Sequence, residues 1–381
     1  MRALTFANAS HQNTPSTSSP RHRQNIVVVT GGAGFIGHHL CLAAAKDARV
    51  ARVVCVDDFD RHGPYPVTWK ERNASALTRA GVDVVRVDAC DEDKLAHCLR
   101  SSARALGSAR ELDARVIHLA SRSGIAAAES DVVGAVRANV LTTAAVLAVA
   151  RQMNQEKSSL VRVPRVVVAS SGSVYGDQNV HSIMSPKASF VDDDSDEYTS
   201  TYAATKGASE GLVRAAFANG MNTDASAVCA RIFTVYGPRG RPDMAIWRFI
   251  EQLHAGKRVT KFGDGRSTFR DYVYVDDACE ALMKCAFAEL ATSPYAVVNV
   301  AGGRAMYLDD VIRACERACG VTGAVDEFPG RPGDVGGTYG DVASALATID
   351  WAPKTSLSEG LRRTVEWWRS SDADGYRDPS A

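Results

Sequence analysis

The stretch IVVVTGGAGFIG, at Ile26–Gly37, joins a run of β-branched residues to a glycine-rich turn. A run such as Ile26–Val29 is typical of a strand that is buried on both faces of a parallel sheet. Gly31, Gly34 and Gly37 have the spacing GxxGxxG, and helical periodicity begins directly after the turn. Glycines at such a turn let the backbone approach a pyrophosphate, and the free amides of a helix N-terminus attract its negative charge. The stretch therefore predicts the first βα unit of a dinucleotide-binding fold.

An acidic residue stands where this fold needs one. Twenty residues beyond Gly37, the second expected strand ends in Asp57. A carboxylate at this place hydrogen-bonds a ribose 2′-hydroxyl and repels a 2′-phosphate, which favours NAD over NADP. Arg61 is close in sequence and leaves NADP open. Asp88, at the end of the third expected strand, is a candidate contact for the adenine end of the cofactor.

The same alternation of strand and helix continues downstream. Short apolar runs recur between segments of helical periodicity, which is the βαβ pattern of a parallel sheet. The expected strands are 52–56, 82–87, 115–118, 165–169 and 225–230, and the long expected helices are 35–46, 131–152 and 202–218. The sequence therefore predicts an α/β protein with a Rossmann-type doubly wound parallel sheet.

After Arg231 the alternation weakens into Gly- and Pro-rich stretches with shorter helices near 244–254, 275–290 and 308–319. Loops on a rigid scaffold are where ligands are commonly held. We therefore expect an NAD-binding Rossmann domain at 25–231 and, at 232–381, a lobe that is mainly substrate-binding and interleaved with that domain. Residues 1–24 lack acids and are rich in Ser, Thr and Pro, which predicts a disordered tail and leaves organelle targeting open.

Composition excludes several classes of function. Forty-four Lys plus Arg balance forty-four Asp plus Glu, so a strongly basic nucleic-acid or membrane-surface binder is not expected. The nine cysteines are scattered without any CxxC, which favours neither disulfides nor a metal site and is typical of a cytoplasmic protein. No apolar run is expected to reach the roughly 20 residues that span a bilayer.

A second group of residues, a serine-rich strand end and a Tyr–Lys pair, indicates acid–base catalysis. The fifth strand runs into SSGSVYG at 170–176, and YAATK follows at 202–206. Spacing of four places Tyr202 and Lys206 on one helix face. An ammonium beside a phenol favours the phenolate, so we expect Lys206 to lower the pKa of Tyr202 toward that of a general base. A YxxxK spacing alone is common on surface helices, but joined to the glycine-rich unit it is a strong signal.

At these motifs the sequence resembles the nucleotide-sugar epimerases of the extended short-chain dehydrogenase/reductase superfamily. TGGAGFIG at 30–37, HLAS at 118–121, SSGSVYG and YAATK match in order and spacing, and the resemblance covers about 25–368. The string FTVYGPRGRPDMA at 233–245 resembles the signature of the UDP-glucuronate 4-epimerases. RDYVYVDD at 270–277 and PGDV at 332–335 support that likeness.

The resemblance implies NAD-dependent inversion at C4 of a UDP-hexuronic acid through a 4-keto sugar. It implies that Tyr202 is the base, that Ser171 shares its hydrogen bond to the substrate and that Lys206 orients the nicotinamide ribose. The residues it implies for the cofactor are Gly31, Gly34, Phe35, Ile36, Gly37, Asp57, Asp88, Ala89, Leu119, Ala120, Ser121, Asn139, Tyr202, Lys206 and Val235. Those it implies for the substrate are Ser171, Gly172, Ser173, Tyr202, Thr234, Arg241, Arg248, Arg270 and Asp334.

Some positions depart from the family pattern. Gly172 replaces a serine of SSSSVYG and removes one donor to the sugar carboxylate. Ser121 and Ser123 alter the HLAAxAG loop, with Arg122 between them near the expected sugar site. These departures leave the choice of sugar open.

Other functions stay in view. A UDP-glucose 4-epimerase is the nearest alternative, and a related decarboxylase or dehydratase is disfavoured because no acid stands beside the serines of the strand-five motif. A non-catalytic NAD(P)-sensing protein would be expected to lack the Tyr202–Lys206 pair. The helices expected at 131–152 and 202–218 would pair across a two-fold axis in the family's homodimer, so we expect a homodimer.

Overall fold

The glycine-rich unit forms strand β1 (Asn25–Thr30) and helix α1 (Phe35–Ala45) in the computed structural model of the chain. The structure describes residues 24–106, 112–156, 158–176, 198–218, 225–290, 293–330 and 336–377. The predicted tail at 1–24 therefore lies almost entirely outside the described residues, as does Asp334.

Seven parallel strands form the main sheet, in the order β10-β6-β5-β4-β1-β2-β3. Besides β1 they are β2 (Val50–Asp57), β3 (Asp83–Arg86), β4 (Leu112–His118), β5 (Val161–Ser171), β6 (Ser226–Ile232) and β10 (Tyr295–Val300). This order confirms the predicted doubly wound sheet, and it reverses direction beside β1. In such sheets ligands bind outside the carboxyl ends of the strands at that switch point.

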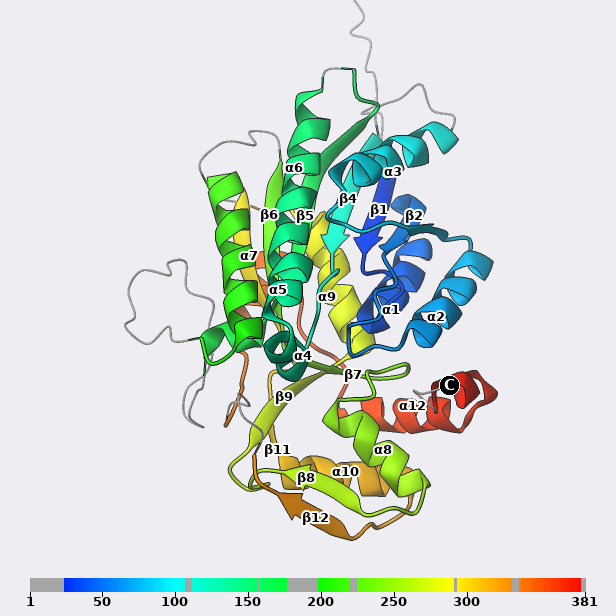
Figure 1. Cartoon of the computed structure of the whole chain (residues 1–381), viewed down its shortest axis with the longest axis vertical. Helices are drawn as coiled ribbons and strands as arrows, with labels where there is room; N and C mark the ends of the chain where they lie inside the picture. The colour runs from blue at the N-terminus through cyan, green and yellow to red at the C-terminus, as the bar shows by residue number, and fades with distance from the viewer. Residues whose placement is uncertain are drawn as a thin grey trace, which may run out of the picture.

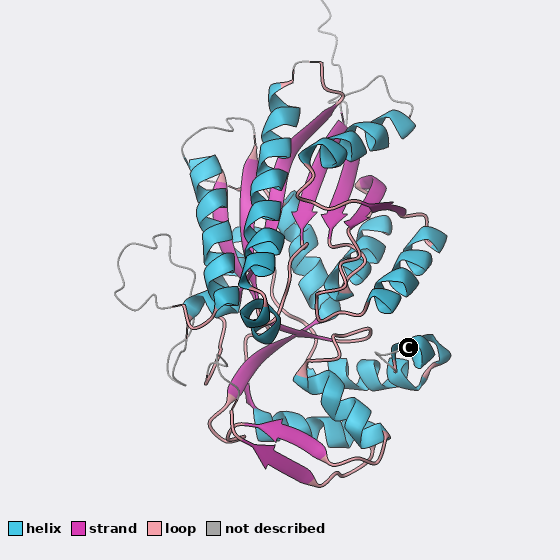
Figure 2. Ribbon diagram, viewed as in Figure 1, coloured by secondary structure: helices cyan, strands magenta, loops and turns pink. Residues whose placement is uncertain are grey.

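Helices cover both faces of the sheet (Figure 2). Along β1, Val27 and Val29 belong to one buried cluster, which includes side chains of α1, α2 (Val67–Arg79) and α9 (Val275–Phe287). Ile26 and Val28 belong to the other, with α3 (Glu92–Ala105), α6 (Thr142–Gln155) and α7 (Thr201–Ala218). Because successive side chains of a strand point to opposite faces, one unbroken apolar run serves both layers.

The second half of the chain builds a smaller lobe below the carboxyl ends of these strands (Figure 1). It contains the strands β7 (Thr234–Tyr236), β8 (Val259–Phe262), β9 (Phe269–Tyr274), β11 (Ala305–Tyr307) and β12 (Val325–Phe328). Its helices are α8 (Ala245–His254), α10 (Leu308–Cys319), α12 (Leu357–Arg369) and the short 3-10 segment η3 (Ser371–Tyr376), whereas α11 (Ala343–Ile349) packs against β10 and α9. Between β9 and β11 the chain returns to the large sheet as α9 and β10.

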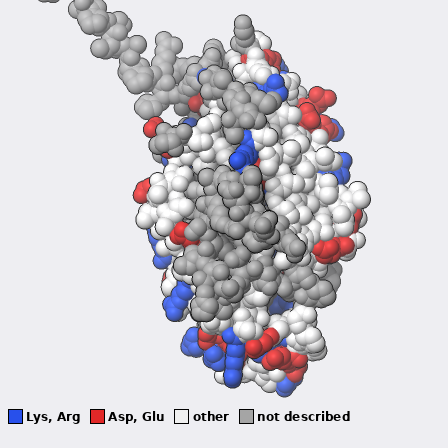
Figure 3. All heavy atoms as spheres, turned by 90° about the vertical axis from the view of Figure 1, so that its left-hand side faces the viewer, with Lys and Arg blue, Asp and Glu red and all other residues white. Residues whose placement is uncertain are grey.

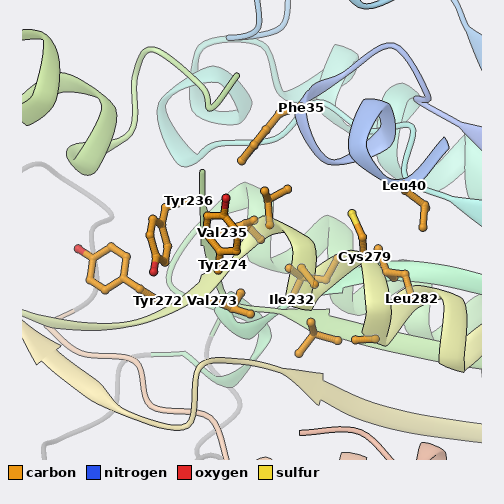
Figure 4. Close-up of a cluster of buried hydrophobic side chains, with 14 of the residues drawn as sticks. Phe35, Leu40, Ile232, Val235, Tyr236, Tyr272, Val273, Tyr274, Cys279 and Leu282 are labelled. Atoms are coloured by element: carbon orange, nitrogen blue, oxygen red, sulfur yellow. The ribbon is translucent and has the colours of Figure 1, made fainter. Parts of the chain in front are cut away.

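One apolar cluster joins the glycine-rich unit to this lobe (Figure 4). Phe35, the first residue of α1, lies in it together with Val235 and Tyr236 of β7 and Tyr274 of β9. All four side chains are less than a tenth exposed. A shared apolar core therefore fixes the start of α1 relative to strand β7.

The helix predicted at 131–152 is confirmed as a helix over Val132–Gln155. It consists of α5 (Val132–Val136), a π-helical segment η1 (Arg137–Leu141) and α6 without interruption, and the short helix α4 (Ile125–Ser130) precedes it. Our expectation that no segment reaches membrane-spanning length was wrong, because Val132–Gln155 is 24 residues long and apolar enough by composition. In the fold α6 packs against β5 and α3, so its apolar face is buried against the sheet.

Candidate active site

A cleft of about 1020 Å³ lies between the carboxyl ends of the strands and the smaller lobe. It is lined by the glycine-rich turn, by the ends of β2, β3, β4 and β5, by the start of α7 and by β7. Of the predicted site residues in the described part of the chain, all but Asn139 line it. The topology thus brings together motifs that are up to 239 positions apart, from Gly31 to Arg270.

The glycine-rich turn is shaped for close approach. Gly31 has a φ of +71°, and a Cβ there would lie 2.7 Å from the backbone nitrogen of Ala120. A Cβ on Gly37 would lie 2.2 Å from the carbonyl oxygen of Gly31. Gly34 differs, because its Cβ would meet only that oxygen, at 3.3 Å, and would otherwise face open space. Within the described residues no side chain caps α1, so the open side of Gly34 and the helix amides fit a dinucleotide pyrophosphate.

Asp57 is buried at the end of β2 and is 3% exposed. Its carboxylate accepts hydrogen bonds from the backbone nitrogens of Ala33 and Phe59 at 3.1 and 2.9 Å, and from Lys70 Nζ at 3.0 Å. Lys70 therefore partly neutralises a charge that the sequence analysis treated as isolated. Arg61 is exposed and does not line the cleft, so a 2′-phosphate gains no support from it.

Asp88 lies at the neighbouring strand end and lines the same part of the cleft. One oxygen accepts from the backbone nitrogen of Cys90 at 2.8 Å, and the other from Arg137 at 2.7 Å. Arg137 belongs to the π-helical segment, so the adenine end expected from the sequence has a basic as well as an acidic side chain.

Ser171, Tyr202 and Lys206 meet where β5 ends and α7 begins. Ser171 closes β5 and accepts a hydrogen bond from the backbone nitrogen of Ser173 at 3.1 Å, within the 3-10 segment η2 (Gly172–Tyr175). Lys206 Nζ donates to the carbonyl oxygen of Ala169 at 2.8 Å and lies 5.9 Å from the centre of the Tyr202 ring. The predicted serine, tyrosine and lysine therefore share one wall of the cleft.

Burial and two neighbouring side chains determine the pKa of the Tyr202 phenol. Burial raises the pKa of the Tyr202 phenol, while the charge of Arg241 and a hydrogen bond with Ser171 oppose that rise. The Lys206 ammonium itself is directed to the carbonyl of Ala169. Burial lowers the pKa of Lys206 itself to about 8. Arg241 is thus a cation that favours the phenolate.

Arg241 is anchored by two side chains. It pairs with Asp243 through Nε and Nη2, at 3.0 and 2.6 Å, and its Nη1 donates to Ser123 Oγ at 2.9 Å. Arg248 lies over the Phe262 ring at 5.2 Å, and Arg270 donates to the carbonyl oxygens of Phe269 and Gly336. Thr234 and Ser173 also line the cleft.

Gly172 faces an aromatic ring, and this explains the absence of a side chain there. A Cβ on Gly172 would lie 3.0–3.1 Å from three carbon atoms of the Phe233 ring. Phe233 is 7% exposed and packs with Tyr175 and Ala301. The departure from the family serine is thus coupled to the position of Phe233.

Asn139 lies behind the cleft wall and is 1% exposed. Its side chain accepts from the backbone nitrogen of Arg122 at 2.8 Å and donates to Thr205 Oγ1 at 2.9 Å. It therefore ties the loop after β4 to the residue before Lys206. A π-helical segment such as the one that carries it is often found at functional sites.

Sequence reasoning missed a buried ion pair behind the catalytic strand. Glu210 is fully buried and accepts from Arg231 at 2.9 and 2.7 Å. Ser170, next to Ser171, also hydrogen-bonds to Glu210. A usable signal was present, because Tyr202, Lys206 and Glu210 follow each other at intervals of four on α7.

Comparisons with known proteins agree with this geometry. A family model described as the NAD dependent epimerase/dehydratase family matches residues 27–301. A probable UDP-glucuronate 4-epimerase of Rhizobium meliloti is 30% identical, over 90% of this chain and 96% of its own. The UDP-glucuronate 4-epimerase of Thermodesulfobacterium geofontis is 31% identical, over 89% and 95%. The crystal structure of UDP-glucuronic acid 4-epimerase from Bacillus cereus with UDP-glucuronic acid and NAD is 28% identical, covers 90% and 98%, and has a TM-score of 0.74.

Proposed function

The chain belongs to the NAD dependent epimerase/dehydratase family, and from that premise we propose that it interconverts UDP-glucuronate and UDP-galacturonate by inverting C4. The enzyme is thus an isomerase with NAD as its cofactor. The observation that carries the proposal is the meeting of Ser171, Tyr202 and Lys206 with the glycine-rich turn in one cleft. Relatives of nearly equal length that carry this activity support it.

The Rossmann part, 25–231, would hold the cofactor. The open side of Gly34 and the amides of α1 suit the pyrophosphate, and Asp57 suits a ribose hydroxyl. Lys206 is placed to hydrogen-bond the nicotinamide ribose. When bound, NAD supplies the capacity to accept a hydride from C4 and to return it. The remaining predicted cofactor residues on the cleft wall are Phe35, Ile36, Gly37, Asp88, Ala89, Leu119, Ala120, Ser121 and Val235.

Tyr202 would take the proton from the sugar 4-hydroxyl and give it back. As the phenolate forms, the Arg241 guanidinium and the Ser171 hydroxyl stabilise its charge. Ser171 also hydrogen-bonds the 4-oxygen while that oxygen is a carbonyl. Hydride removal and return on opposite faces of the 4-keto sugar then invert C4, so the protein begins and ends with the same protonation state.

The smaller lobe, mainly 232–381, would hold the UDP-sugar. Thr234 and Ser173 offer hydroxyl donors to the sugar carboxylate, and Arg241, Arg248 and Arg270 offer charge to the diphosphate. Because Gly172 has no side chain, it leaves space beside the Phe233 ring in the proposed sugar site. Asp334, outside the described residues, is proposed for the nucleoside ribose.

Proton NMR of UDP-glucuronate incubated with the purified protein tests the proposal. We expect UDP-galacturonate to accumulate to equilibrium without added reductant, and Tyr202→Phe to abolish this while the variant still binds NAD. Turnover of UDP-glucose alone would instead select a hexose epimerase, and release of CO₂ would select a decarboxylase. No turnover of any nucleotide sugar would select an NAD(P)-sensing protein.

We also propose a homodimer. A stripe of apolar side chains along the α5–α6 segment and α7 is exposed to solvent: Val132, Val133, Val136, Leu141 and Leu212. Figure 3 shows the side of the molecule nearest α7, where charged side chains gather at the lower end. Exposed apolar stripes of this kind are typical of protein interfaces. A monomeric mass in light scattering would refute the dimer.

The cytoplasm is the proposed compartment. All nine cysteines are free thiols and eight of them are buried, which suits a reducing environment. Cell fractionation of the tagged full-length chain tests this, and an organelle-bound product shortened at its N-terminus would contradict it.

A further inference from the structure

Arg122 occupies a place that the reaction proposed above does not use. It follows β4, and its side chain is 8% exposed. The guanidinium donates through Nη2 to Asp60 at 3.4 Å and through Nη1 to Asp131. Asp60 belongs to the loop after β2, and Asp131 caps the N-terminus of α5. The sequence analysis placed Arg122 near the sugar, whereas its partners lie on the cofactor half of the cleft.

The order of the strands shows that the Arg122–Asp60 contact spans the end of β1. Strands β4 and β2 lie on either side of β1, so a contact between the segments that follow them crosses the carboxyl end of β1 (Figure 1). Two strand spacings are about 10 Å. The glycine-rich turn follows β1 at that end, and both Arg122 and Asp60 line the cleft. The pair therefore passes over the crevice in which a pyrophosphate would lie.

The base of this arginine is rigid. Asn139 accepts from its backbone nitrogen at 2.8 Å and donates to its carbonyl oxygen at 3.3 Å. A Cβ on Gly134 would lie 2.1 Å from Nη1, so the glycine leaves the space that the guanidinium fills. Asp131 is itself fixed by the backbone nitrogen of Gly134 at 2.9 Å. The contact to Asp60 is the longer and weaker of the two ion pairs.

One donor of Arg122 is left over. Its Nε is buried and has no hydrogen-bond partner among the described residues. An unpaired buried donor costs free energy, which an oxygen atom of a bound dinucleotide would relieve. A group that is firmly fixed on one side, weakly paired on the other and incompletely satisfied is suited to open for a ligand and to close over it.

We propose that Arg122, anchored by Asp131 and paired with Asp60, is a strap that retains NAD in the cleft. This inference rests on the proposed function, in which the same hydride leaves and returns and the cofactor stays bound between turnovers. Arg122 is then a positioning residue whose loss speeds cofactor release. It takes no part in the proton transfer at Tyr202.

The experiment compares NAD retention in wild type, Arg122→Gln, Asp60→Asn and the double variant. Bound nucleotide is quantified after denaturation, and its dissociation is followed by chase with excess labelled NAD. We expect each single variant to release NAD at least 10-fold faster, and the double variant to be no faster than Arg122→Gln. Arg61→Gln is the matched control, because it removes an exposed arginine beside Asp60 that does not line the cleft. It should release NAD at the wild-type rate.

Each other outcome has a definite meaning. Wild-type retention in Arg122→Gln would overturn the strap. Equal or tighter retention in Asp60→Asn would also overturn it, because Asp60 would then only compete for an arginine that binds phosphate directly. If Arg122→Gln does not fold, Asp60→Asn still decides, since Asp60 is partly exposed and its loss leaves the anchor to Asp131 intact. A wild-type protein that cannot bind NAD at all would refute the proposed function rather than the strap alone.

Discussion

Two glycines three positions apart should separate folding from cofactor binding. A Cβ on Gly37 would lie 2.2 Å from the Gly31 carbonyl oxygen and 2.7 Å from Gly32 Cα, and both are backbone atoms that cannot rotate away. Ordinary contacts begin at 3.4 Å, so the turn would have to move by about 1 Å. Overpacking of this kind costs roughly 1–3 kcal/mol. We expect Gly37→Ala to lower the free energy of unfolding of the NAD-free protein by about 3 kcal/mol.

Gly34→Ala should behave differently. Its backbone, with φ −72° and ψ −178°, is accessible to alanine, and the added methyl group would face the cleft apart from one 3.3 Å contact. Stability should therefore change by less than about 1 kcal/mol. The methyl group would stand where the pyrophosphate must approach, so NAD binding should weaken at least 10-fold, which is about 1.4 kcal/mol.

Urea unfolding of NAD-stripped protein gives the stabilities, and calorimetric titration gives the NAD affinities. Gly211→Ala is the control for a general effect of replacing glycine by alanine, because Gly211 lies within α7 with nothing near its added Cβ. It should stabilise by up to about 1 kcal/mol and leave NAD binding unchanged. Equal losses of stability in the Gly34 and Gly37 variants, or full NAD affinity in Gly34→Ala, would refute the geometric reasoning.

Three further predictions concern the walls of the cleft. Glu210→Gln should lower the free energy of unfolding by about 3 kcal/mol, seen as a lower urea midpoint, because it leaves the charge of Arg231 buried without its carboxylate partner. Gly172→Ser should cost about 1 kcal/mol because the Phe233 ring must retreat, and adding Phe233→Leu should recover it in a double-mutant cycle. Burial lowers the pKa of His118 to about 3, so the folded state holds it neutral. Its contribution is present above pH 6.5 and is lost as the pH falls toward 3, by up to about 1.4 kcal/mol per pH unit, and His118→Asn should flatten that slope in urea midpoints.

Local patterns explain why much of this fold was predictable. The strand before Gly31 and the helix after it follow from neighbouring residues, and so does the spacing of Tyr202 and Lys206. The α/β class was predicted from these signals and is confirmed by the structure, which also places both motifs on one cleft. Repeated βα units produce a parallel sheet because each helical crossover returns the chain to the end of the sheet at which the previous strand began.

Contacts between distant segments were not predictable. Lys70 beside Asp57 and Arg122 beside Asp60 depend on how loops turn after their strands, which no spacing rule gives. The helix expected at 131–152 contains a π-helical segment at Asn139, whose side chain bonds Arg122 and Thr205. These tertiary hydrogen bonds have no counterpart in the local sequence pattern, which predicts a regular α-helix.

The activation of Tyr202 illustrates the same difference in chemical terms. Helical spacing correctly places Lys206 on its face, but a lysine side chain is long, and its ammonium is directed to the Ala169 carbonyl. With a pKa of about 8, Lys206 is about nine-tenths protonated at pH 7 and so remains a hydrogen-bond donor for a ribose hydroxyl. Arg241, which is held by Asp243 and Ser123 rather than by α7, also favours the phenolate. The base therefore belongs to the large sheet's helix layer, and the cation that tunes it belongs to the segment after β7.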